Sequence, residues 1–446
     1  MVHRCATGVH RFDPRMNRCR GTVRPMSDDA PRRSRDPHRP VLEAADEGHR
    51  VTTLELFFDL VFVLAITQVT GYMAQHLTPI GMLEGLILLA LTWWAWVAFA
   101  WLGTTIRFDE GLVRVLLFAV MGMVLVISMG LPEAFADAPG GFDGPLATPT
   151  VIALAYAAVR ALHVGLFALA GRDDPAMRAA VGRFGAGVAL AMSLLVAGSL
   201  QDGWLRMALY AAAVAIDIAG AYLGGGAGWA LNPGHFAERH GLIIIIALGE
   251  SIVAIGSGAS DLPLSPAISV TALLGLVISA CLWWVYFDIT ALAAERTLTR
   301  LTGATRNRAA RDAYSVAHLP MIAGIVLLAL GIKKTVALVG TEPVDLWGHV
   351  KPLAAMALSG GVALYLIGHL AFRLRMDHSW SRPRAVATVV CLALAAAAPL
   401  LPTVVLLVAV TLVLCVLVHH EHRRMGWFSY HLRHAEHGGD GPPSSG

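Results

Sequence analysis

Charged residues are scarce in this chain, and their scarcity excludes an ordinary soluble domain. Only 15% of the 446 residues are charged, and 56% are hydrophobic. Soluble domains average about 25% charged residues. Lysine is nearly absent, with three residues in the whole chain, and the five cysteines outline no disulfide framework. Three of the cysteines lie in apolar runs, where we expect buried, unreactive thiols.

Recognisable catalytic and cofactor motifs are also lacking. There is no nucleophile elbow, zinc motif or dinucleotide fingerprint, and Gly224–Gly226 has neither a preceding strand nor the lysine of a phosphate loop. We therefore expect no cofactor, no bound metal and no nucleic-acid partner. The histidine-dense C-terminal residues allow adventitious metal binding, but a solvated tail is the better interpretation.

Long hydrophobic runs fill most of the sequence. Runs of about 20 apolar residues are typical of membrane spans. They predict an all-α polytopic integral membrane protein of about 12 transmembrane helices, with the lipid bilayer as its partner. The expected spans are 54–76, 80–102, 112–131, 149–170, 184–200, 204–223, 241–257, 266–290, 314–332, 350–372, 384–400 and 402–420. A hairpin of two half-spans is an alternative for the last pair.

The two ends of the chain differ from the membrane region. Residues 1–50 hold eleven arginines and no apolar run, which predicts a disordered basic arm on the cytoplasmic leaflet. Because Met26 offers another start, residues 1–25 are either part of this arm or not translated. Residues 421–446 are expected to form a cytoplasmic, histidine-rich tail.

Arginine placement predicts the orientation. The segments expected on one side of the membrane hold 28 of the 34 lysines and arginines, whereas the opposite loops hold just three. By the positive-inside rule, both termini are expected to be cytoplasmic, in the inner membrane of a bacterium.

Several features recur at an offset of 180–210 residues. Glu55 corresponds to Glu238, Trp93–Trp94 to Trp283–Trp284, and Tyr156 to Tyr365. We expect a duplication of six spans, with a first half at 51–223, a cytoplasmic linker at 224–240 and a second half at 241–420. Transporters commonly have such repeats, and their sites lie between them.

Two carboxylates lie one helical turn apart in the first apolar run. Glu55 and Asp59 fall on one helical face near the cytoplasmic end. Charged side chains inside a membrane are costly and usually face the protein interior or a wet cavity. Because the two charges repel each other, at least one acid is expected to hold a proton near neutral pH. The alternative is that both lie in the interface and pair with loop arginines.

Glu250 is a third acid, near the middle of the seventh span. It shares a helical face with Arg239, but eleven residues separate the two, about 16 Å along a helix, so they cannot pair directly. We expect Glu250 to lie deeper than Glu55 and Asp59 and to be the best candidate for a central site. The first two acids are then gate or entry residues.

Other polar residues in apolar runs complete the set of candidates. Arg160 is a natural partner for one of the acids, and Arg114 and Asp217 are expected to be countercharges. The remaining candidates for substrate or proton coupling are Gln68, Arg239, Asp288, Tyr314 and His318. For the histidines, we expect a structural role rather than a role as ligands.

Two long motifs resemble those of a known family. ELFFDLVFVLAITQVT, which contains Glu55, and HFAERHGLIIIIALGESIVAIG, which contains Glu250, resemble signatures of the bacterial low temperature requirement protein A family. The resemblance covers roughly residues 50–420. It implies a multi-pass inner-membrane protein with no established reaction. The motif residues that it carries over are Glu55, Phe57, Phe58, Asp59, Gln68, His235, Glu238, Arg239, Gly249, Glu250, Asp288 and His318.

Three functions compete. The first is a proton- or ion-coupled transporter of a small, unidentified solute. The second is an intramembrane enzyme acting on a lipid or isoprenoid with Glu55, Asp59 and Glu250 as acid, base or metal ligands; no DDxxD-like cluster is present, which counts against it. The third is a structural or sensory membrane protein. A homo-oligomer is left open.

Overall fold

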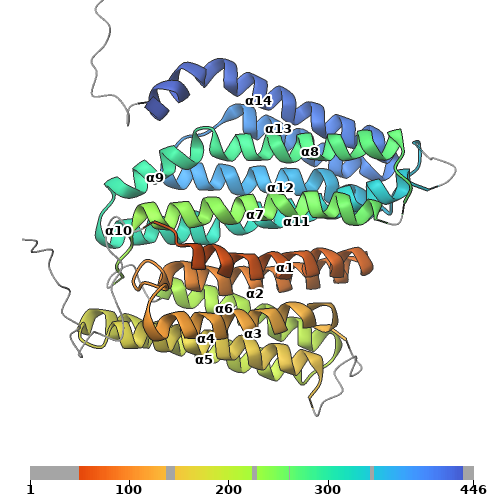
Figure 1. Cartoon of the computed structure of the whole chain (residues 1–446). Coiled ribbons are helices and arrows are strands. Elements are labelled where there is room, and N and C mark those ends of the chain that lie inside the picture. The colour runs from red at the N-terminus through yellow and green to blue at the C-terminus, as the bar shows by residue number, and fades with distance from the viewer. Residues whose placement is uncertain (1–49, 137–145, 224–228, 261, 342–345, 435–446) are drawn as a thin grey trace, which may run out of the picture. The chain divides into compact units, whose positions relative to one another are not determined.

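The protein is described by a computed structural model that covers residues 50–136, 146–223, 229–260, 262–341 and 346–434, with side chains described to residue 424. Within these ranges the regular structure is entirely helical (Figure 1). The α-helices are α1 (Thr53–Gln75), α2 (Pro79–Leu102), α3 (Gly111–Gly130), α4 (Thr148–Ala170), α5 (Pro175–Ser199), α6 (Gly203–Leu223), α7 (Pro233–Ala259), α8 (Pro266–Phe287), α9 (Thr290–Arg300), α10 (Gly303–Ala309), α11 (His318–Val339), α12 (Pro352–Met376), α13 (Arg382–Ala397) and α14 (Thr403–His434).

Side-chain caps determine where many of these helices begin. Thr52, Thr78, Asn232 and Ser265 each accept a hydrogen bond from a backbone N–H in the first turn of the following helix. In three of the four helices a proline follows within the first two positions, where its missing N–H costs nothing.

The predicted membrane architecture is confirmed. Among the described residues, twelve helical stretches are long and apolar enough to cross a membrane, with α8–α9 and α10–α11 each counted as one. The chain is a polytopic all-α membrane protein. The last two spans are separate crossings, α13 and α14, so the hairpin of half-spans is not needed.

Several helices extend beyond the predicted spans. α7 begins at Pro233 instead of 241, so the second part of the expected linker at 224–240 is helical. α5 begins at Pro175 instead of 184, and α14 continues to His434 instead of ending at 420. The first turns of α5 and α7 are polar, so hydropathy alone did not predict where these helices begin. Residues 1–49 of the expected basic arm, 224–228 of the linker and 435–446 of the tail lie outside the described residues.

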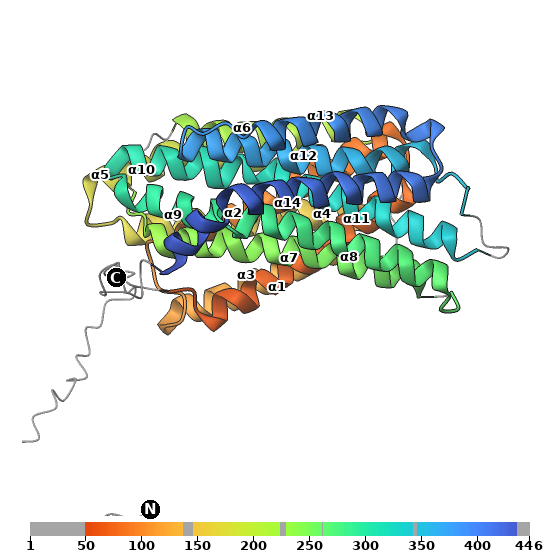
Figure 2. The same ribbon diagram turned by 90° about the horizontal axis from the view of Figure 1, so that it is seen from above.

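The long helices form two groups that lie side by side. Figure 1 shows α1–α6 in one group and α7–α14 in the other, and Figure 2 shows the long axes roughly aligned. The groups meet where α1 and α2 contact α7 and α11. Within the second group, α11 also packs against α7, α8 and α12.

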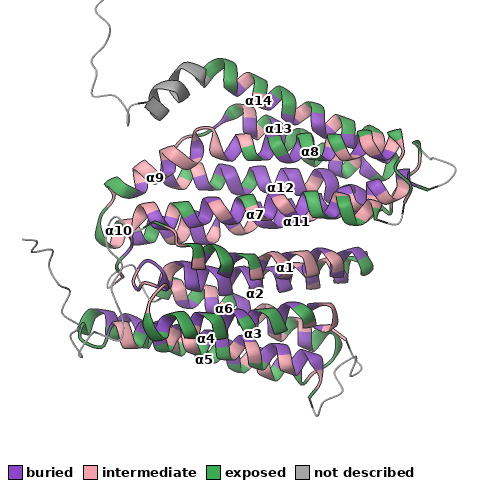
Figure 3. Cartoon of the chain, viewed as in Figure 1, coloured by how far each residue is buried: buried purple, intermediate pink, exposed green. Residues whose placement is uncertain are grey.

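Burial separates central from peripheral helices. The most apolar windows of α2 and α10–α11 are 78% buried and that of α12 is 72%, whereas those of α6 and α13 are 33% buried. Figure 3 shows the exposed faces on the outer helices. Since exposed apolar side chains such as Leu125, Ile252 and Val389 lie there, these faces are suited to lipid.

Glycines bring α11 and α12 into backbone contact. A Cβ atom on Gly324 would lie 2.5 Å from the Gly361 carbonyl oxygen, and one on Gly331 would lie 2.6 Å from Leu358 Cα. No side chain larger than hydrogen fits at either position unless the helices separate. Small residues at such crossings are a common basis of helix association in membranes.

We expect Gly324→Leu to destabilise the protein strongly, because the added side chain meets backbone atoms that cannot move aside. Overpacking alone costs about 1–3 kcal/mol. The measurement is the midpoint of thermal unfolding in detergent. Gly122→Leu is the matched control, since Gly122 is exposed on α3 and a Cβ added there would have nothing within 4 Å. Equal midpoints for the two variants would contradict the close contact.

Candidate functional site

The candidate site begins at the first turn of α1. Thr52 and Glu55 form a capping box: the Thr52 hydroxyl accepts from the Glu55 N–H at 3.3 Å, and Glu55 Oε2 accepts from the Thr52 N–H at 2.9 Å. This arrangement fixes one carboxylate oxygen of Glu55 on its own helix. The other oxygen, Oε1, is directed to a neighbouring helix.

Glu55 Oε1 meets two basic side chains of α7. His235 Nε2 lies 2.9 Å from it, and Arg239 Nη1 lies 3.5 Å from it. All three residues are at most 2% exposed. Close approach is possible because Gly103 ends α2 here; a Cβ at Gly103 would lie 2.9 Å from Glu55 Oε1. The predicted membrane acid is therefore buried between the two helix groups.

Asp59 lies one turn further along α1 and is fully buried. Its Oδ1 accepts hydrogen bonds from Arg239 Nη2 and from the indole N–H of Trp96, the latter at 2.8 Å. The Arg239 guanidinium also lies 5.5 Å from the centre of the Trp96 ring. Asp59 Oδ2 and Arg239 Nε have no hydrogen-bond partner among the described residues. Each charged group of the cluster therefore has an ion-pair partner, but some of its polar atoms make no hydrogen bond to any described residue.

The cluster has an unequal number of fixed charges. Glu55 and Asp59 are two carboxylates, and within the described ranges Arg239 is the one arginine that contacts both. His235 is the remaining basic partner and is charged only when protonated. With His235 neutral the four groups carry a net charge of −1, and one added proton brings them to zero. A buried net charge is costly, and Arg239 alone does not balance it.

A second set of polar rings extends from the cluster. The His240 ring lies 4.9 Å from that of Trp96 and 5.3 Å from that of His318. His240 Nδ1 donates to the Phe236 carbonyl at 2.8 Å, so its Nε2 carries a lone pair. His318, one of the candidates from the sequence, is thus joined to the acids through ring contacts.

A π-helix positions His318 and Tyr314. Residues Ala310–Val316 adopt this wider turn, and His318 Nδ1 donates to the Ala313 carbonyl at 3.0 Å. His318 Nε2 consequently accepts from the Tyr286 hydroxyl at 2.9 Å. Tyr314 stacks on His318 with ring centres 5.3 Å apart. Short π-helical segments are frequent at functional sites.

Glu250 lies apart from this cluster. Its Oε2 accepts from the Thr67 hydroxyl at 2.6 Å, and the residue is 2% exposed. Thr67 is twelve residues beyond Glu55 on α1, or about 18 Å along the helix. The α1–α7 interface therefore holds two acid sites at different positions along α1. The deeper position in the membrane expected for Glu250 stays a prediction.

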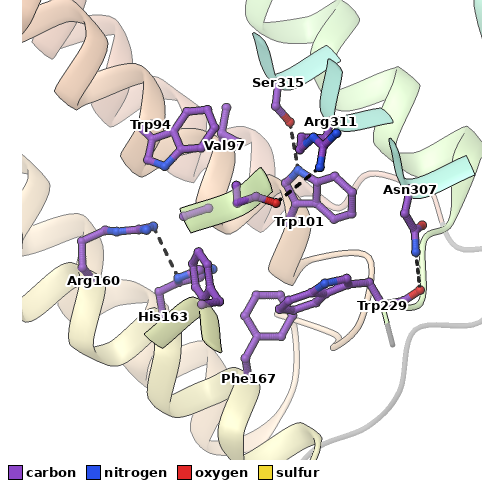
Figure 4. Close-up of a pocket in the computed structure, with 13 residues that line it drawn as sticks. Trp94, Val97, Trp101, Arg160, His163, Phe167, Trp229, Asn307, Arg311 and Ser315 are labelled. Carbon is purple, nitrogen blue, oxygen red and sulfur yellow. Dashed lines mark hydrogen bonds between the residues drawn. The ribbon is translucent and has the colours of Figure 1, made fainter. Parts of the chain in front are cut away.

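Arg160 pairs with a different acid from those expected. Its Nη2 donates to Asp217 Oδ1 at 2.7 Å, with both side chains buried. Asp217 is thus a countercharge, but Arg114 is not its partner, because Arg114 donates to the Asp109 carbonyl at an exposed position. Arg160 lines a cavity that contains none of Glu55, Asp59 or Glu250 (Figure 4).

Two further candidates, Gln68 and Asp288, lie on α1 and at the end of α8. Asp288 follows the last residue of α8 and is partly buried, with its N–H bonded to the Trp284 carbonyl at 3.1 Å. Gln68 is partly buried in α1, next to Thr67. Their roles stay predictions.

One buried ion pair was not expected from the sequence. Arg384 of α13 binds both carboxylate oxygens of Glu421 on α14, at 2.7 and 2.8 Å, and also contacts His369 of α12 at 2.8 Å. The predicted boundaries put both charged residues at the end of a span or in the tail. Ser381 caps α13 by accepting a hydrogen bond from the Arg384 backbone N–H, and a serine followed closely by a proline is the sequence signal that α13 begins at Arg382.

These features define a class: a polytopic helical membrane protein with ion pairs buried between its helices. Residues 50–419 match the bacterial low temperature requirement A protein (LtrA) family, and the chain belongs to that family. An uncharacterized protein of Rhizobium meliloti (strain 1021), RA0937, is 28% identical over 326 residues, which cover 70% of this chain and 75% of that protein. No solved structure matches the chain.

We expect Arg239→Met to lower the stability of the folded protein by about 3–5 kcal/mol, because it leaves two buried carboxylates with one histidine. The readout is the thermal unfolding midpoint in detergent. Arg172→Met is the matched control: its pair with Asp173 is 63% and 89% exposed and is worth at most about 1 kcal/mol.

A second variant separates charge from packing. Asp59→Asn combined with Arg239→Met removes one of the two uncompensated charges, so the double variant is expected to unfold at a higher temperature than Arg239→Met alone. A double variant less stable than the single one would show that the ion pair does not dominate.

Proposed function

We propose that this protein is a proton-coupled transporter of a small solute, and that Glu55, Asp59, His235 and Arg239 form its proton-coupling site. The observation that carries the proposal is the charge count of the cluster. One arginine compensates one of the two buried carboxylates, so the second has no fixed countercharge in the cluster, and a proton on a carboxylate or on His235 would supply the missing positive charge. A change in the number of bound protons changes the pairing between α1 and α7.

The position of the cluster supports a role in conformational change. Each contact joins α1 of the first helix group to α7 of the second: Glu55 to His235, and Asp59 to Arg239. Transporter sites commonly lie between two structural repeats that move relative to each other. Breaking or forming these contacts would alter how firmly the two groups hold together.

Repeated contacts support the duplication that the sequence suggests. The Tyr156 hydroxyl of α4 donates to the Leu91 carbonyl of α2 at 2.9 Å, and the Tyr365 hydroxyl of α12 donates to the Leu282 carbonyl of α8, also at 2.9 Å. The packing of α1 on α3 and of α3 on α4 likewise has counterparts in α7 on α11 and α11 on α12. We include two related halves in the proposal.

The proposed orientation places the cluster near the cytoplasm. Arginine is concentrated at the end of the bundle where α1 and α7 begin, which the positive-inside rule assigns to the cytoplasmic side of a bacterial inner membrane. Glu250, farther along the same interface, then lies deeper in the membrane. It is a natural second station for the proton or a contact for the solute.

Solute-evoked currents in proteoliposomes test the proposal. Purified protein on a solid-supported membrane is exposed to concentration jumps of amino acids, sugars, organic acids and organic cations, at two pH values. We expect at least one class to give a current that changes with pH. Asp59→Asn should abolish the pH dependence because it removes a carboxyl from the cluster without changing its shape.

The controls distinguish coupling from damage. Asp173→Asn changes an exposed acid and should leave the currents as in wild type. Glu250→Gln should reduce transport, because it removes an acid at the deeper station. No current with any solute class, or unchanged pH dependence in Asp59→Asn, would overturn the proposal and favour a structural role for the acids.

A further inference from the structure

A cavity lies between the helix groups at the end where α7 begins. Its volume is about 80 Å³, counted as the space that the centres of water-sized molecules can occupy. One wall comes from α2, α4, α5 and α6, and the other from α10 and the π-helix of residues 310–316. Figure 4 shows its lining side chains directed toward a common space.

Five tryptophan and phenylalanine side chains are among the residues that line the cavity. They are Trp94, Trp101, Phe167, Phe184 and Trp229. Phe167 and Trp229 pack edge to face with ring centres 4.8 Å apart, and the Trp101 indole is held by a 2.9 Å hydrogen bond to the Ser315 hydroxyl. Rigid aromatic walls of this kind suit a flat, apolar body.

The charges of the lining are all positive. Arg160 and Arg311 are the charged lining residues, and no acid is among them. Arg160 is fully buried, and its Nε has no hydrogen-bond partner among the described residues although its Nη2 binds Asp217. A buried donor without a partner is costly unless something else accepts from it.

Arg311 carries charge in excess of its countercharge. It binds Asp312 at 2.8 Å, but the same carboxylate also binds Arg375 at 2.9 Å. Two guanidinium groups thus share one acid. The Arg311 side chain remains 13% exposed, and its guanidinium stacks 3.8 Å from the centre of the Tyr222 ring. Stacking holds the group in place while leaving it able to bind an anion.

We propose that this cavity is a binding site for small aromatic carboxylates, with the ring held among the indoles and the carboxylate bound by Arg311. Guanidinium groups match carboxylates in charge and in planar geometry, and the neighbouring rings exclude water. The cavity is separate from the proton-coupling cluster, so the inference does not depend on transport.

Equilibrium titration of the purified full-length protein tests this site. The probe is 2-naphthoate, and 2-naphthylmethanol is its neutral counterpart of similar shape. Wild type should bind 2-naphthoate at least tenfold more tightly than the alcohol, because the charge-assisted hydrogen bonds are lost with the alcohol. Equal affinities would overturn the proposal, since they would indicate partition into apolar surface only.

Two variants locate the binding. Arg311→Gln should weaken binding of 2-naphthoate about tenfold or more, and it leaves Asp312 paired with Arg375, so the fold is not burdened with a lone acid. Arg308→Gln on α10 is the matched control, because Arg308 is exposed and outside the lining. Ala221→Trp should abolish binding by filling the cavity. Retained binding in Ala221→Trp, with normal thermal unfolding, would place the ligand elsewhere.

Anionic lipid is the other source of a negative headgroup. Adding phosphatidylglycerol to the titration should leave the affinity for 2-naphthoate unchanged. Competition by the lipid at the Arg311-dependent site would overturn the assignment to a free carboxylate. Binding without any solute-evoked current would contradict the proposed transport function and leave this site intact.

Discussion

Arg239 and the two acids that share it are the constraint on which the helix arrangement depends. A carboxylate inside a membrane must find a cation or a proton, and Glu55 and Asp59 find theirs on a helix that begins about 180 residues later. This requirement holds α1 parallel to α7 in one register. Because α1 and α7 belong to different helix groups, the same contacts fix how the groups meet. A structural need and the proposed chemistry therefore rest on the same four side chains.

Two other sets of contacts lie near the α1–α7 interface. The glycine contacts of α11 and α12 make a tightly packed pair with no room for adjustment, and the indoles of α2 hydrogen bond to Ser315 in the π-helix. The cavity adjoins the second of these features, since Trp101 and Ser315 both line it. A carboxylate that contacts Arg311 would touch the π-helix directly, and that segment also presents Tyr314 to His318. Aromatic contacts thus connect the cavity to the acid cluster without any shared lining residue.

Much of the membrane architecture could be predicted from the sequence, because soluble domains rarely contain apolar runs as long as a bilayer is thick. Glu55 and Asp59 were recognisable as a buried stripe by their four-residue spacing. Their partner was not, since pairing across 180 residues depends on helix packing that hydropathy does not record. Arg160 was an equally good candidate to pair with these acids, because an unpaired arginine in a membrane is also costly, yet it binds Asp217. The start of α7 was readable in principle from Asn232 and Pro233, a cap followed by proline. The π-helix has no comparable signal.

The parallel register of α1 and α7 has a consequence for how the protein is made. α1 leaves the ribosome about 180 residues before Arg239, which at about 5–20 residues per second corresponds to roughly 10–40 s. During that time the first helix group is in or near the membrane without Arg239, the arginine that binds the two carboxylates in the folded protein. Until then, Glu55 and Asp59 must be protonated, lie at the membrane–water interface, or be shielded from lipid by the insertion machinery. The acids that stabilise the folded protein are thus without their partner until α7 has been synthesised.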